Sequence, residues 1–167
     1  MMVGLASAAP ATKLIIDTDM STDCDDVGAL CIAHALEQRG EAELLAVVHD
    51  TGVSSGVGAV SSINHYYGRD DLLVGGYKGE YDKTVHGSYI DDLVAKFPAA
   101  VTNLSQVPDA VEVYRRALAA APDTSVWISS IGFTTNIEML LKSEPDHISP
   151  MNGTELVQAK VKGIAWM

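Results

Sequence analysis

The sequence predicts an α/β fold in which a parallel β-sheet carries helices on both faces. Short apolar runs of strand length recur along the 167 residues, and they are almost continuous rather than alternating. Such runs are typical of parallel strands that are buried on both sides. Longer helical stretches separate these runs, and this alternation indicates βαβ units. A cluster of acidic residues follows the first run, where open α/β sheets bind their ligands.

The first half of the chain contains three predicted strands, at residues 14–16, 43–49 and 72–74. The second of these strands is too apolar to be half exposed, so it fits the centre of the sheet. Helices are predicted at residues 27–38, 54–67 and 90–97. We expect Ser54 or Ser55 to cap the second helix, because a serine hydroxyl accepts a hydrogen bond from a free N–H of the first turn.

In the second half we predict a helix, a strand, a helix and a final strand, at residues 108–120, 125–130, 137–142 and 161–166. The first of these helices has a proline in its first turn and an apolar stripe formed by Val111, Tyr114 and Leu118. The stretch 155–159 is ambiguous between helix and strand.

The chain stops one residue after the final predicted strand, whereas an open parallel sheet is normally flanked by helices. We therefore expect the sequence to be cut inside a larger fold. Residues 1–12 are predicted to be a flexible tail or a weak signal remnant, and residues 13–167 to be part of one α/β domain. An exposed sheet edge invites pairing with another chain, so we also expect a homo-oligomer.

Composition narrows the classes of partner. The net charge is −11, from 22 acidic and 11 basic residues. Such a charge disfavours binding to a nucleic-acid backbone or to an anionic membrane. No apolar run approaches the ~18 residues that a membrane-spanning helix needs. We therefore expect neither nucleic acid nor membrane as a partner, and the negative charge fits a cation-binding site.

Five carboxylates fall within ten residues after the first predicted strand: Asp17, Asp19, Asp23, Asp25 and Asp26. Clustered carboxylates repel one another unless protons or a cation lie among them. Oxygen ligands at this density suit a hard cation such as Ca²⁺ or Mg²⁺. The simpler alternative is a loop of solvated acids, with the last two next to the first turn of a helix, where the dipole favours negative charge.

These residues resemble a known signature. Asp17-Thr-Asp19 followed by Asp25-Asp26-Val-Gly-Ala-Leu30 resembles the N-terminal motif of the nucleoside hydrolases, Asp-x-Asp-Pro-Gly-x-Asp-Asp. The chain departs from this motif at Met20-Ser21, which replaces Pro-Gly, and in two extra residues before the final pair. The segment Ser130–Asn136 also resembles the family's Gly-Pro-Leu-Thr-Asn turn. The resemblance implies a Rossmann-like sheet of the nucleoside hydrolase type, of which this chain would be the N-terminal half.

The resemblance also implies an activity, which is hydrolysis of the N-glycosidic bond of ribonucleosides to ribose and free base. It implies a calcium cofactor, with a calcium-bound water that Asp19 activates as general base. The implied metal ligands are Asp19, Asp26 and the backbone carbonyl of Thr135. The implied substrate-binding residues are Asp25, Asp50 and His86.

Members of this family are about twice as long as this chain, so we expect the chain alone to be a weak or inactive hydrolase. Two other functions stay open. Asp17-Thr-Asp19-Met-Ser21 partly matches the start of haloacid-dehalogenase-type phosphatases, in which the first Asp attacks phosphorus. The chain could also be a non-catalytic fragment that binds a metal or ribose.

Four further side chains carry predictions of their own. His49 ends a predicted strand, and we interpret it as a polar strand terminus rather than a catalytic acid. We expect His34 on the surface or at an interface, and Trp127 and Trp166 in the core of the sheet.

Overall fold

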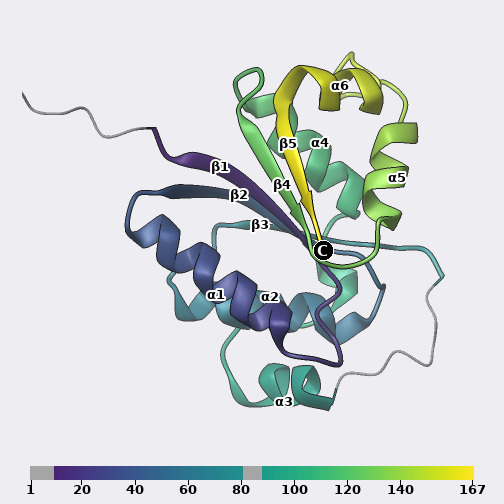
Figure 1. Cartoon of the computed structure of the whole chain (residues 1–167). Helices are drawn as coiled ribbons and strands as arrows, with labels where there is room; N and C mark the ends of the chain where they lie inside the picture. Colours follow the sequence, from purple (N-terminus) through teal and green to yellow (C-terminus); the bar gives the residue numbers. More distant parts are fainter. Residues whose placement is uncertain (1–9, 81–87) are drawn as a thin grey trace, which may run out of the picture.

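The computed structural model describes residues 10–80 and 88–167, and its centre is a five-stranded sheet in which every strand pair is parallel (Figure 1). The strand order is β3-β2-β1-β4-β5. The strands are β1 (Thr12–Thr18), β2 (Ala42–His49), β3 (Leu73–Gly76), β4 (Val126–Ser130) and β5 (Val161–Trp166). All five predicted strands are therefore confirmed.

Helices cover both faces of this sheet (Figure 1). They are α1 (Asp25–Gln38), α2 (Ser54–Tyr66), α3 (Ser88–Lys96), α4 (Ala110–Ala120), α5 (Thr135–Lys142) and α6 (Gly153–Lys160), with a short 3-10 helix at Leu104–Gln106. The first three helices pack on one face and the last three on the other. The predicted fold class, a parallel sheet between two helical layers, is confirmed.

The core is divided in two by the sheet, as alternation along β1 requires. Ile15 points to the layer of α4, α5 and α6, where it packs in a cluster with Tyr114, Leu118 and Ile128. Ile16 points to the opposite layer, which contains the buried side chains of α1 and α2. Burial on both faces explains why the strands are continuous apolar runs in the sequence.

Two details of the helices differ from or complete the predictions. The N-cap of α2 is Val53, which has no side-chain hydrogen bond to give, so the predicted serine cap is wrong. The Ser54 hydroxyl instead accepts a hydrogen bond from the Leu104 N–H at 3.3 Å, which ties α2 to the 3-10 helix. The ambiguous stretch 155–159 belongs to α6, which Asn152 and Glu155 start with a reciprocal capping box.

The predictions for His34 and the tryptophans are wrong. His34 is buried, because its ring stacks on Tyr67 at 4.6 Å and its Nε2 lies 2.8 Å from the side-chain oxygen of Asn64. Trp127 and Trp166 are 37% and 57% exposed. They lie on β4 and on the edge strand β5. On this side of the sheet α1 leaves a hollow, which Leu14, Ile32 and Trp127 border.

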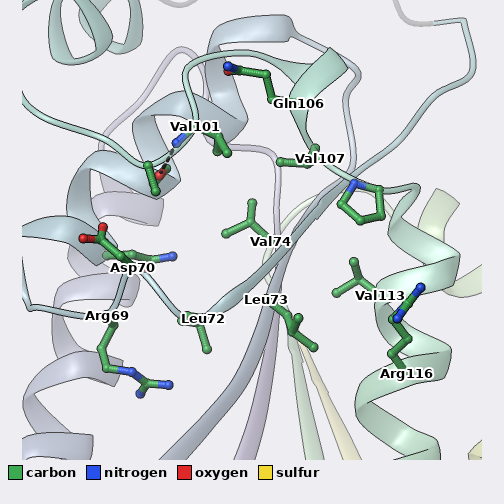
Figure 2. Close-up of a pocket in the computed structure, with 14 residues that line it drawn as sticks. Arg69, Asp70, Leu72, Leu73, Val74, Val101, Gln106, Val107, Val113 and Arg116 are labelled. Atoms are coloured by element: carbon green, nitrogen blue, oxygen red, sulfur yellow. Dashed lines mark hydrogen bonds between the residues drawn. The ribbon is translucent and has the colours of Figure 1, made fainter.

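The open edge of the sheet at β3 borders a cavity of about 370 Å³ between α2 and α4 (Figure 2). Apolar side chains line most of it, including Leu73, Val74 and Val113, and Arg69 and Arg116 are also among its lining residues. This cavity contains none of the predicted site residues. The predicted homo-oligomer, formed by pairing at a sheet edge, stays a prediction.

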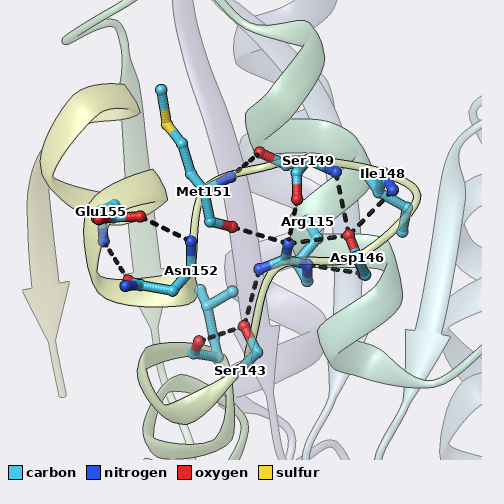
Figure 3. A network of polar contacts seen from close by, with 9 residues as sticks. Arg115, Ser143, Asp146, Ile148, Ser149, Met151, Asn152 and Glu155 are labelled. Carbon is cyan, nitrogen blue, oxygen red and sulfur yellow. Dashed lines mark hydrogen bonds and ion pairs between the residues drawn. The ribbon is translucent and has the colours of Figure 1, made fainter.

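A buried arginine organises the connection between α5 and α6 (Figure 3). Arg115 of α4 is 2% exposed and donates two hydrogen bonds of 2.9 Å to the two oxygens of Asp146. It also donates to the Ser143 hydroxyl and to the carbonyls of Ser149 and Met151. One side chain thus fixes the path of the loop that leads to α6 and β5.

Among the described residues, no helix has the length and apolar character needed to cross a membrane.

Candidate functional site

The acidic residues lie where the sheet changes its direction of winding. From β1 the chain builds β2 and β3 on one side, and it then returns to place β4 on the other side of β1. Asp17, near the end of β1, is in register with Val48 of β2 and Ser130 of β4. This position is the topological switch point of the sheet, beside which doubly wound sheets bind their ligands.

The predicted acidic pair opens α1, as expected. Asp25 and Asp26 are its first two residues, and a six-residue loop that contains Asp19 and Asp23 joins them to β1. Oxygens of Asp23, Asp25 and Asp26 lie within 4.8 Å of one another. Burial and then the charges of Asp23 and Asp25 raise the pKa of Asp19, which is half-buried. Asp23, which the resemblance did not assign to the metal, is thus part of the same cluster.

Asp26 is the buried member of this cluster. Its Oδ1 accepts a hydrogen bond of 2.5 Å from the Thr18 hydroxyl, whereas Oδ2 has no partner among residues 10–80 and 88–167. Burial, with a smaller contribution from Asp19, raises the pKa of Asp26 to about 6. A buried carboxylate oxygen with no donor costs free energy, and a cation or a ligand hydroxyl would remove that cost.

Asp17 has a different environment, since both of its oxygens are satisfied. It is fully buried, and it accepts a hydrogen bond of 2.8 Å from the Tyr114 hydroxyl and one of 2.9 Å from the Asn136 side-chain amide. Burial is the main reason that the pKa of Asp17 is raised to about 7. The carboxyl group therefore connects β1 to α4 and α5, and it fixes the strand end that carries Asp19.

The sequence prediction missed this connection, because it took Tyr114 as an apolar stripe residue. We predict that Tyr114→Phe lowers the free energy of unfolding by about 2 kcal/mol, because it leaves a buried carboxyl oxygen without its donor. Urea unfolding followed by circular dichroism measures this loss. An unchanged unfolding midpoint would show that the Tyr114 hydroxyl contributes nothing to the fold.

Gly132, in the loop after β4, allows two strand ends to approach. A Cβ atom at this position would lie 2.6 Å from the Asp19 backbone nitrogen and 2.6 Å from Asp50 Oδ2. Asp50, which follows β2, therefore lies beside Asp19 across a residue that has no side chain. Asp50 is 2% exposed, and burial together with the charges of Asp17, Asp19 and Asp26 raises its pKa to about 9.

The remaining predicted residues lie at the same edge or outside the described part. Thr135 is the first residue of α5 and directly precedes Asn136, which binds Asp17. His86 lies outside the described residues. His49 is buried with its Nε2 3.0 Å from the Met20 carbonyl, and burial lowers its pKa to about 4. A neutral imidazole that faces a backbone carbonyl agrees with the interpretation of His49 as a strand terminus.

The side chains at this edge suit a hard divalent cation. Asp19, Asp23, Asp25 and Asp26 offer only oxygen, and within residues 10–80 and 88–167 no basic side chain is among the groups that shift the pKa values of Asp19 and Asp26. The unpartnered Asp26 Oδ2 is available for a further contact. Carboxylate oxygens of this number and kind are the ligands of Ca²⁺ and Mg²⁺ in proteins.

Fold and site together define a doubly wound α/β domain with an acidic cluster at its topological switch point. Solved structures share this fold. The chain superposes on the type III effector XopQ in complex with adenosine diphosphate ribose, with a TM-score of 0.70 and 22% identity. It superposes on the plant nucleoside hydrolase PpNRh1 with a TM-score of 0.63 and 22% identity. It superposes on a purine-preferring ribonucleoside hydrolase from Gardnerella vaginalis with a TM-score of 0.60 and 20% identity.

These superpositions cover 93–94% of this chain but only 43–48% of the matched structures. The chain thus spans somewhat less than half the length of the structures that it resembles. No protein-family model and no curated protein matches the sequence. The fold implied by the nucleoside hydrolase resemblance is confirmed, whereas the roles that the resemblance assigns to single residues stay predictions.

Proposed function

We propose that this chain carries the cation-binding and ribose-binding part of a nucleoside hydrolase, which cleaves the N-glycosidic bond of ribonucleosides to ribose and free base. One observation carries the proposal. Asp19, Asp25 and Asp26 gather at the switch point of a sheet whose fold is that of solved nucleoside hydrolases. The acidic motif on which the sequence resemblance depends is therefore also a cluster in space.

In this proposal Asp19 is the general base. It is half-buried, and the neighbouring carboxylates favour its protonated form, so it is suited to take a proton from the attacking water. Cleavage of a ribosyl C–N bond develops positive charge on the sugar ring, which nearby carboxylates stabilise. Asp25, Asp50 and His86 are the residues that we assign to the ribose.

The cation is proposed to be Ca²⁺, held by Asp19, Asp26 and the Thr135 carbonyl, with Asp23 close enough to contribute. A bound Ca²⁺ would supply positive charge that lowers the pKa of a nearby water and grips ribose hydroxyls. We leave Asp17 out of this set, because it is fully buried and each of its oxygens already accepts a hydrogen bond, one from Tyr114 and one from Asn136.

The buried state of Asp17 argues against the phosphatase alternative. That chemistry requires the first Asp of the motif to attack phosphorus, yet Asp17 is fully buried and hydrogen-bonded on both oxygens. A second candidate ligand comes from the XopQ structure, which shares the fold and is a complex with adenosine diphosphate ribose. We therefore include adenosine diphosphate ribose among the compounds to be tested.

The test measures release of free base from inosine and uridine by the chain, with and without Ca²⁺. We expect a slow release that requires Ca²⁺ and that a chelator abolishes. Binding of ribose and of adenosine diphosphate ribose, measured by calorimetry in the same buffers, distinguishes a catalytic site from a binding fragment. If the chain neither releases base nor binds any of these ribosyl compounds in the presence of Ca²⁺, the proposal is wrong.

A further inference from the structure

Asp50 is the least satisfied charged group in the described part of the site. It lies directly after β2, is 2% exposed, and has no hydrogen-bond partner on either carboxyl oxygen among the described residues. The Phe133 N–H lies close enough to lower its pKa slightly, but the two groups do not make a hydrogen bond of ordinary geometry. Buried carboxyl groups in folded proteins are almost always paired, so the absence of a partner calls for a ligand.

The surroundings of Asp50 show which ligand would satisfy it. The charged groups that act on it most strongly are three further carboxylates, Asp17, Asp19 and Asp26. Its Oδ2 faces the backbone of Asp19 across Gly132, at the edge of the sheet where the acidic cluster lies. Four acids with no basic partner among the described residues need protons or a cation as counter-charge.

We propose that Asp50 belongs to the cation site, and that its carboxylate raises the affinity of that site for Ca²⁺. This inference rests on the proposed function, and it adds a role to the ribose contact assigned to Asp50 above. A carboxylate has about four lone-pair positions, so one oxygen can act on the cation while the other accepts a hydrogen bond from a sugar hydroxyl. Cation affinity in oxygen sites rises with the number of charged ligands.

The experiment compares the wild-type chain with Asp50→Asn, which keeps the shape of the side chain and removes its charge. Titration of each protein with CaCl₂ by calorimetry gives the affinity, which we expect to be at least about tenfold weaker in the variant. The matched control is Asp123→Asn. This residue lies at the opposite end of the sheet, in the turn before β4, where its carboxylate is 76% exposed and pairs with Lys160.

A second measurement separates a cation role from a structural one. We expect Ca²⁺ to raise the melting temperature of the wild type more than that of Asp50→Asn, while without Ca²⁺ the variant melts no lower than the wild type. Asparagine has nearly the same shape, and Asp50 has no hydrogen bond to the described residues that the exchange could break, so the metal-free fold is not weakened. Because each Ca²⁺-induced shift is measured within one protein, a general loss of stability does not produce the difference.

Each outcome decides between the two proposals. Weaker Ca²⁺ binding and a smaller Ca²⁺-induced shift in Asp50→Asn, with no change in Asp123→Asn, support the inference. Equal Ca²⁺ affinity in the wild type and Asp50→Asn overturns the inference and leaves the proposed function standing. A wild-type chain that binds no Ca²⁺ overturns both.

Discussion

Asp19→Asn is expected to slow Ca²⁺-dependent release of base from inosine by about 10²- to 10⁴-fold, which is the range for the loss of a positioned general base. The amide has nearly the shape of the carboxylate but cannot accept the proton. Asp19 is half-buried and has Asp23, Asp25 and Asp26 beside it. Burial and the neighbouring charges raise its pKa, which makes its carboxylate a stronger base. The variant also loses one negative ligand, and its Ca²⁺ affinity should fall as well.

The measurement follows released base under conditions in which the enzyme is in excess, so that a slow wild-type rate is still resolved. Asp123→Asn, at the far end of the sheet, serves again as the control for a lost surface charge. Wild-type activity in Asp19→Asn would refute the role of general base. In that event Asp25, the neighbouring exposed carboxylate at the start of α1, becomes the next residue to test.

The elements of the fold could be predicted from the sequence because burial on both faces gives each strand a continuous apolar run. The run at 43–49 became β2, in the centre of the sheet, and the run at 125–130 became β4. The boundaries were less predictable, since they depend on contacts between elements. Ser54 illustrates this point, because its hydroxyl binds the backbone of Leu104, fifty residues away, rather than capping its own helix.

The candidate site could be predicted only in its local part. Asp19, Asp25 and Asp26 lie within eight positions of one another, so a sequence motif can represent them. The hydrogen bonds that hold Asp17 join residues 97 and 119 positions apart, and no local pattern encodes them. The position of Asn136 directly after Thr135, in a turn that resembles one of the nucleoside hydrolases, was the one available signal for its role.

Burial explains the errors in the other predictions. A histidine in a helix is usually exposed, but His34 stacks on Tyr67 and binds Asn64, so its ring is removed from water. Burial lowers the pKa of His34, which keeps the ring neutral. Trp127 and Trp166 are strand residues whose neighbours cover them only in part. In both cases the burial of the side chain depends on which residues pack against it, and the position of the residue in a helix or strand pattern does not show this.

Arg115→Met is expected to lower the free energy of unfolding by about 3 kcal/mol. This value is at the low end of the range for breaking a buried ion pair, because Asp146 is one-third exposed and water can hydrate it. Methionine fills the space but leaves the Ser143 hydroxyl and the carbonyls of Ser149 and Met151 without their donor. The loop before α6 should therefore lose its fixed path together with the ion pair.

Arg116→Met is the matched control, since this arginine lies next along α4 but is half exposed and pairs only with Glu112. We expect it to cost less than about 0.5 kcal/mol, as exposed pairs within one helix do. The pH dependence supplies a second check. Hydrogen bonds from Arg115 hold the pKa of Asp146 well below its ordinary value of 3.8, so the stabilisation is complete above pH 3.8 and is lost as the pH falls below it. The difference in unfolding free energy between the wild type and Arg115→Met should therefore narrow in acid. A difference that stays constant down to the acid transition would mean that the ion pair with Asp146 is not the source of the stability.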